Sequence, residues 1–154
     1  MNLIRSTQHQ FQFRLGRREK QVLLGLLNLY PCLPAAHQPL SKSGGLPGQE
    51  TGQGLLDEAL AEQRQENRRQ LQALLADPGR FQEQETGWRL SLSPADLEWL
   101  LQVLNDIRVG SWVLLGSPEE QLVGLDEKTA PHYWAMEMSG QFQMQFLEAM
   151  QGPN

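Results

Sequence analysis

The sequence predicts a mostly α-helical fold, a single-domain helical bundle with one small two-stranded β ribbon. The chain has 154 residues, a length that suits one domain with one modest core. Its residues are 40% apolar, and in several segments they recur every three or four positions, as in an amphipathic helix. Residues 11–15 and 88–92 instead alternate apolar and polar side chains, the period of a half-buried strand.

The first predicted strand, residues 11–15, ends at Gly16 and is followed by a helix. Apolar residues recur at helical spacing over residues 17–30. Pro31 ends this helix, because proline has no backbone N–H to donate to the helical ladder. Residues 31–54 are rich in Pro, Gly and Ser, a composition that predicts a flexible loop.

A charged helix is predicted over residues 55–76. Polar residues interrupt its apolar stripe, so we expect it to pack at its two ends and to be solvated between them. The apolar members of the stripe are Leu56, Leu60, Leu71 and Leu74, and the interrupting ones are Gln63 and Asn67.

The second predicted strand, residues 88–92, is followed by a well-marked helix start. Ser93 can cap the helix, Pro94 suits its first position, and the Asp96 carboxylate can accept a hydrogen bond from the cap amide. This helix should end at Gly116. A short helix is expected over residues 117–123, and a final one over residues 129–150.

The two strand–helix units resemble each other. When Phe11 is aligned with Trp88, Glu19 falls on Asp96. A duplication within the chain would explain this, and so would the general similarity of amphipathic strand–helix units. In either case the two strands should pair, because an isolated strand leaves its backbone amides without partners.

Composition and charge favour a soluble cytoplasmic protein. The 18 acidic and 13 basic residues give a net charge of -5, which argues against nucleic acid as the main partner. A lone cysteine, Cys32, cannot form an internal disulfide, as is usual in a reducing compartment. The N-terminus lacks the apolar run of a signal peptide, and the apolar window 97–115 contains too many charges for a membrane span.

No motif for catalysis, metal binding or a cofactor is present in the sequence. His9, His37 and His132 are far apart and lack the spacing of metal ligands. Cys32 lies close to two prolines in the predicted loop, and a nucleophile there would need a base and a pocket. We therefore expect no catalytic residue, no metal and no cofactor.

The polar segment around Asp106 interrupts a helix that is apolar on nearly every side. Asn105, Asp106 and Arg108 follow Leu104, and Asp106 shares a stripe with apolar residues. A buried carboxylate needs a cation or several donors. Arg14, Arg17 or Arg18 could supply the cation for Asp106, and Arg108 could meet Glu137 of the final helix. Such pairs would either fix how helices dock or form a polar pocket of Asn105, Asp106, Arg108 and Glu137.

The final helix offers a candidate partner surface. Soft methionines beside aromatic residues can line an adaptable groove, although such a stripe can equally be core. The candidate surface contains Trp134, Met138 and Met144 of this helix and the basic residues Arg14, Arg17 and Arg18.

The segment Trp99–Arg108, followed by Leu115-Gly116, resembles the signature helix of an actinobacterial family catalogued as a domain of unknown function. The resemblance extends to the aromatic strand and leucine-rich helix near the N-terminus and to the final helix. Members of that family are often encoded near the Clp protease adaptor. The resemblance therefore implies a regulatory or interaction role and no established activity.

The sequence thus favours a noncatalytic protein-interaction or regulatory module that binds a protein partner or a second copy of itself. Two other classes remain open. One is a small-ligand-binding or enzymatic domain with the polar pocket described above, and the other is a structural subunit with a large obligate interface.

Overall fold

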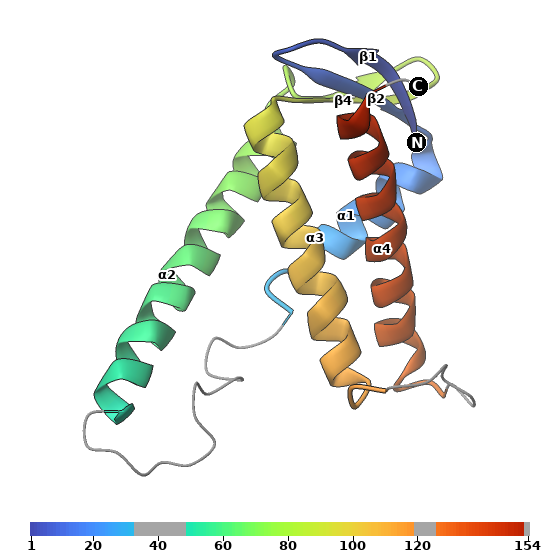
Figure 1. The fold of residues 1–154 in the computed structure, drawn as a ribbon. Helices are drawn as coiled ribbons and strands as arrows, with labels where there is room; N and C mark the ends of the chain where they lie inside the picture. Colours follow the sequence, from blue (N-terminus) through green and yellow to red (C-terminus); the bar gives the residue numbers. More distant parts are fainter. Residues whose placement is uncertain (33–48, 119–125, 153–154) are drawn as a thin grey trace.

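The computed structural model describes residues 1–32, 49–118 and 126–152 and arranges them in two layers, a β-sheet and a group of helices on one of its faces (Figure 1). The elements in chain order are β1 (Asn2–Ser6), β2 (Phe11–Leu15), α1 (Arg17–Leu27), α2 (Gln49–Ala76), β3 (Phe81–Gln84), β4 (Gly87–Leu92), α3 (Pro94–Leu114) and α4 (Ala130–Gln151).

The sheet has four antiparallel strands in the order β1-β2-β4-β3. The two predicted strands are its central pair, with Phe11 opposite Leu92 and Leu15 opposite Trp88. The predicted helical bundle with a two-stranded ribbon is therefore wrong, and the fold is mixed α/β. The edge strands escaped prediction because β1 is exposed at every position and β3 is largely polar, so neither shows the alternation of a half-buried strand.

The hairpin from β3 to β4 depends on Gly87. This residue has a φ of 143°, which side-chain-bearing residues rarely adopt. A Cβ atom there would also lie 2.5 Å from the carbonyl oxygen of Leu15. Only glycine therefore allows β4 to begin this close to the end of β2.

The two strand–helix units fold alike at their junctions. The Glu19 carboxylate accepts a hydrogen bond from the Gly16 amide at 3.0 Å, and the Asp96 carboxylate accepts one from the Ser93 amide at 3.3 Å. The Ser93 hydroxyl in turn accepts from the Asp96 amide at 3.0 Å. The predicted cap of α3 is confirmed, whereas a duplication of the unit stays a prediction.

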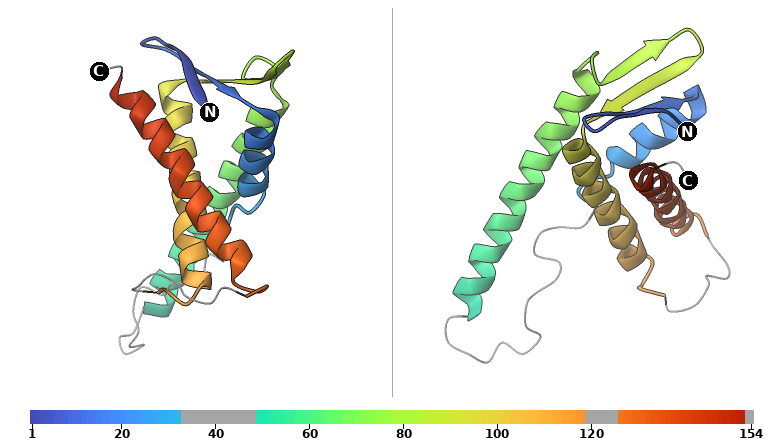
Figure 2. Two further views of the ribbon diagram at one scale, coloured as in Figure 1. Left: turned by 90° about the vertical axis from the view of Figure 1, so that its right-hand side faces the viewer. Right: turned by 45° about the horizontal axis from the view of Figure 1, so that its top comes forward.

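The core lies between the sheet and the helices. Helices α3 and α4 run antiparallel and cross beneath the sheet, with α1 beside them (Figures 1 and 2). The ring of Phe146 in α4 meets Phe13 of β2 edge-on, with centroids 5.1 Å apart. The other large, fully buried side chains are aliphatic: Leu15, Leu23, Leu26, Leu74, Leu90, Leu92, Leu97, Leu100, Leu104 and Ile107. The final helix occupies nearly the range that its periodicity predicts.

Helix α2 begins earlier than predicted, at Gln49. Residues 49–54 of the expected loop therefore belong to a helix, because the helical ladder extends beyond the apolar stripe on which the prediction was based. The remainder of that loop, residues 33–48, lies outside the described residues. So does residue range 119–125, which contains most of the short helix expected after α3.

Only the C-terminal half of α2 joins the core. Leu71 and Leu74 are buried, whereas Leu55 is 64% exposed and Leu60 is 37% exposed. The helix axis diverges from α3 towards Gln49 (Figures 1 and 2). The prediction that α2 packs at both ends and is solvated in its middle is therefore wrong, and Asn67 in that middle is buried.

Candidate functional site

Asn67 is the centre of a buried polar network between α2, α3 and the chain after α1. Its Nδ2 donates to the Tyr30 hydroxyl at 2.8 Å. Its Oδ1 accepts from the indole N–H of Trp99 at 2.9 Å and from the Gln63 amide at 3.1 Å. A buried amide is tolerated when its donors and acceptors are paired, and these bonds attach α2 to the core.

Asp106 continues the polar contacts on the same side of α3. Its Oδ1 accepts from the backbone N–H of Cys32 at 3.2 Å, and Arg64 of α2 approaches its Oδ2 at 3.8 Å. The cation beside Asp106 thus comes from α2, and the expected pairing with Arg14, Arg17 or Arg18 is wrong. The sequence does not reveal how α2 docks, and docking decides which arginine reaches this carboxylate.

Two ionisable groups of this region, Cys32 and Tyr30, have raised pKa values. Burial has the largest effect on the pKa of the Cys32 thiol and raises it; the hydrogen bond with the Ser111 hydroxyl lowers this pKa, and the nearby Asp106 charge raises it by a smaller amount. Burial also raises the pKa of Tyr30. An activated nucleophile requires a lowered pKa. This region therefore joins helices and lacks the electrostatics of a nucleophilic site.

The four residues of the predicted polar pocket are not brought together. Arg108 donates to Asn105 at 3.0 Å, and Gln143 of α4 approaches the same Asn105 oxygen at 3.5 Å. Asp106 instead faces Arg64 and Cys32. Arg108 and Glu137 are both exposed, and Arg108 bonds to Asn105 rather than to Glu137. Successive helical residues point in different directions, so adjacency in sequence did not produce one pocket.

The candidate partner surface is only partly exposed. Trp134 is 41% exposed and its ring lies beside Gly25 of α1, and Met144 is 62% exposed. Met138, by contrast, is partly buried against the core, and its role in a partner surface stays a prediction. The basic members of this surface are also exposed but lie on other elements, Arg14 in β2 and Arg17 and Arg18 in the first turn of α1.

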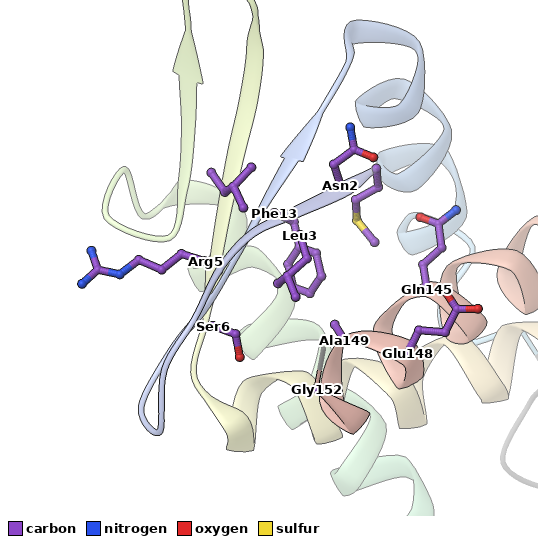
Figure 3. A pocket seen from close by; sticks show the side chains of 11 residues that line it. Asn2, Leu3, Arg5, Ser6, Phe13, Gln145, Glu148, Ala149 and Gly152 are labelled. Atoms are coloured by element: carbon purple, nitrogen blue, oxygen red, sulfur yellow. The ribbon is translucent and has the colours of Figure 1, made fainter. Parts of the chain in front are cut away.

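A cleft opens between β1 and the last turns of α4 (Figure 3). Its volume is about 530 Å³, within the range of roughly 300–1,000 Å³ typical of ligand sites. All residues from Met1 to Ser6 line one side, Phe13 is also part of the lining, and the α4 side consists of Gln145, Glu148, Ala149 and Gly152. The lining is thus mixed, with apolar side chains and a few polar groups.

One polar atom in the cleft wall has no partner. The side-chain oxygen of Gln145 is buried, and no donor among the described residues reaches it. Gln145 extends from α4 towards the Asn2 end of β1 (Figure 3). A buried acceptor without a donor costs free energy, which an N–H group would recover if the Gln145 side chain turned towards the cleft.

The edge strand β1 supplies further unpaired groups beside this cleft. Within the described residues, its inner edge pairs with β2 and its outer edge pairs with no strand. The outer edge of such a strand presents backbone N–H and C=O groups to any incoming extended chain. Leu3 and Ile4 on this strand are 39% and 45% exposed. Sequence reasoning missed β1, and the adjacent apolar pair Leu3-Ile4 was the available signal.

A second, more open depression lies on the other side of α4. It has a volume of about 480 Å³ and is lined by Arg108, Gly140, Gln143, Met144, Leu147, Glu148 and Gln151. Glu148 also lines the cleft, so the two hollows flank the same end of α4. This depression contains the exposed Met144 that the sequence singled out.

The part of the chain that the structure describes contains neither a cluster of metal ligands nor a membrane-spanning helix. Within it, no three or more His, Cys, Asp and Glu side chains are grouped as metal ligands. None of its helices combines the length and apolar character needed to cross a membrane. His37, one of the three histidines, lies outside this part.

Comparisons with known proteins add no family to this description. No family model, no curated protein and no solved structure matches the chain. The resemblance of Trp99–Arg108 to an uncharacterised bacterial family therefore stays a prediction.

Proposed function

We propose that this protein is a noncatalytic, cytoplasmic protein-interaction module that binds an extended segment of a partner protein in the cleft between β1 and α4. The observation that carries the proposal is the combination of a free strand edge with the unpaired Gln145 oxygen in one cleft wall. An added strand gains affinity from backbone hydrogen bonds and specificity from side chains that enter pockets. An extended peptide offers both backbone N–H and C=O groups for the strand edge and side chains for the cleft.

The charge and polar groups elsewhere support a binding role over a catalytic one. The candidate polar pocket is divided between two sides of α3, and the half-buried Cys32 has a raised pKa. The exposed Met144 and Leu147 beside the cleft extend the apolar surface available to a partner. Exposed apolar side chains next to a cleft of mixed lining are typical of protein-binding surfaces.

The test is selection of short random peptides displayed on phage against the immobilised full-length protein. Selected peptides should bind in solution and should shift the NMR amide signals of residues 2–6 and 145. Leu3→Asp should weaken their binding by about tenfold, because it replaces an apolar side chain of the cleft with a charge.

Leu114→Asp is the matched control. Leu114 is 45% exposed, close to the 39% of Leu3, but it lies at the end of α3 and does not line the cleft. It should leave peptide binding unchanged. Failure to select any peptide that shifts β1 signals, or equal effects of the two substitutions, would overturn the proposed function.

A further inference from the structure

The two faces of β1 have different chemistry because of a bulge. Leu3 lies opposite Phe13, whereas Arg5 lies opposite Gln12, so the pairing shifts by one residue at Ile4. Residues two apart in a regular strand share a face. The bulge instead puts Leu3 on the face that packs on the helices and Arg5 on the outer face. In Figure 3 the Arg5 side chain points away from α4 and the cleft.

The outer face of the sheet is rich in hydrogen-bond donors and in positive charge. Arg14 of β2 lies directly opposite Arg89 of β4, and these two are flanked by Asn2 and Gln82 in the same cross-strand row. Arg89 donates to Gln82 at 2.6 Å. Arg5 is exposed in the neighbouring row.

This arginine row lacks a neutralising carboxylate. No aspartate or glutamate occupies the outer-face positions of the four described strands, because Glu83 pairs with Trp88 on the helix-facing side. Like charges directly opposite each other in a sheet are destabilising. An anion bound at this face would remove that repulsion.

We infer that the segment bound at β1 alternates apolar and acidic side chains; this rests on the proposed function. A strand added to the outer edge of β1 continues the pleat, so its alternate residues project onto the same two faces. Those on the helix side meet Leu3 and the wall of α4 that carries Gln145. Those on the outer side extend the two neighbouring rows that contain Arg14 and Arg5, where carboxylates are attracted and ammonium groups are repelled.

The same charges disfavour two other occupants. A second copy paired through its own β1 would join two arginine-bearing faces, and the bulge and Arg5 are features that keep edge strands from pairing with each other. Single-stranded nucleic acid binds sheets through aromatic stacking. Here Phe11, Phe13 and Trp88 share the helix-facing side, and the whole chain carries a net charge of -5.

The experiment compares two labelled synthetic peptides by fluorescence anisotropy with the full-length protein. One alternates valine with glutamate and the other alternates valine with lysine. We expect the glutamate peptide to bind at least about tenfold more tightly at low salt, and the difference to shrink at high salt. Arg5→Glu should reverse the preference, and Arg69→Glu is the control because it changes the net charge equally on the exposed surface of α2.

The outcomes separate this inference from the proposed function. Equal binding of the two peptides, or equal effects of Arg5→Glu and Arg69→Glu, would overturn the acidic character of the partner while strand addition at β1 stands. If phage-selected peptides shift β1 signals but neither alternating peptide binds, the alternating pattern is overturned. If no peptide of any kind shifts those signals, the proposed function itself is wrong.

Discussion

Asn67 shows how one buried amide can fix the position of a helix. It lies on the stripe of α2 that the sequence marks as interrupted, and three side chains from other turns and elements bond to it. Sequence periodicity identifies an asparagine at such a position as a break in the apolar face. In the folded protein Tyr30 and Trp99 form hydrogen bonds with this asparagine, and its burial is tolerated because its donors and acceptors are paired.

Asn67→Ala should lower the free energy of unfolding by about 2–3 kcal/mol, because it leaves the Trp99 N–H and the Tyr30 hydroxyl without partners in a dry environment. Urea denaturation followed by tryptophan fluorescence measures the loss. Gln63→Ala is the control. Gln63 is exposed and its removal leaves no buried group without a partner, so the free energy of unfolding should fall by no more than about 0.5 kcal/mol. Similar losses for both variants would contradict the central role of Asn67.

Cys32 should alkylate slowly in the folded protein, with a rate that rises with pH to a midpoint above that of an ordinary thiol. The thiolate is the reactive form, and burial together with the Asp106 charge raises the Cys32 pKa. Asp106→Asn removes that charge and should therefore move the midpoint to lower pH. The midpoint is measured from the rate of reaction with iodoacetamide as a function of pH, and the chain unfolded in concentrated urea is the reference. Equal midpoints for the folded and unfolded chains would refute the prediction.

At the scale of elements, the sheet contains two kinds of strand. The central strands β2 and β4 bury one face against helices, so alternation reveals them in the sequence. The edge strand β1 is paired through backbone bonds with β2, and β3 is paired with β4 and contributes one buried ring, Phe81, which stacks on Trp88. Backbone groups are the same for every residue type, so the pairing of an edge strand leaves little trace in sequence.

The arginine row across the sheet should cost stability. Arg14→Glu replaces a like-charged cross-strand pair with an opposite-charged one beside Arg89, and should raise the free energy of unfolding by roughly 0.5–1 kcal/mol. Thermal melting at low salt measures the gain, which should diminish as salt screens the charges. Gln12→Glu is a neighbouring control on the same face: it places a carboxylate opposite Arg5 and Ser91 but removes no like-charged pair, and should give a smaller gain. A loss of stability on Arg14→Glu would contradict the repulsion.

Across the whole molecule, the sheet and the helices share one core. Phe146 of α4 contacts both Phe13 of the sheet and Phe142 of its own helix. The helical period of the leucine-rich segments and the capping residues of α3 predicted most helices correctly. The apolar faces of these helices were also predicted, but the four-stranded sheet on which they pack was not.

The candidate site was less predictable than the fold. The sequence singled out Met144, Trp134 and the basic residues Arg14, Arg17 and Arg18, all of which are exposed. It did not reveal the cleft, because that cleft joins residues 1–6 to the last turns of α4. Nor did it predict the division of Asn105 and Asp106 between two sides of α3, which depends on the direction of each side chain.

The sequence by itself therefore determined the central strands, the start of α3, the extent of the final helix and the apolar faces that build the core. These follow from local periodicity and capping, which act over a few residues. Only the tertiary structure decided the edge strands, the docking of α2, the partner of Asp106 and the cleft beside β1. Each of these depends on contacts between segments that are distant in sequence, and no local pattern determines which distant segments pack together.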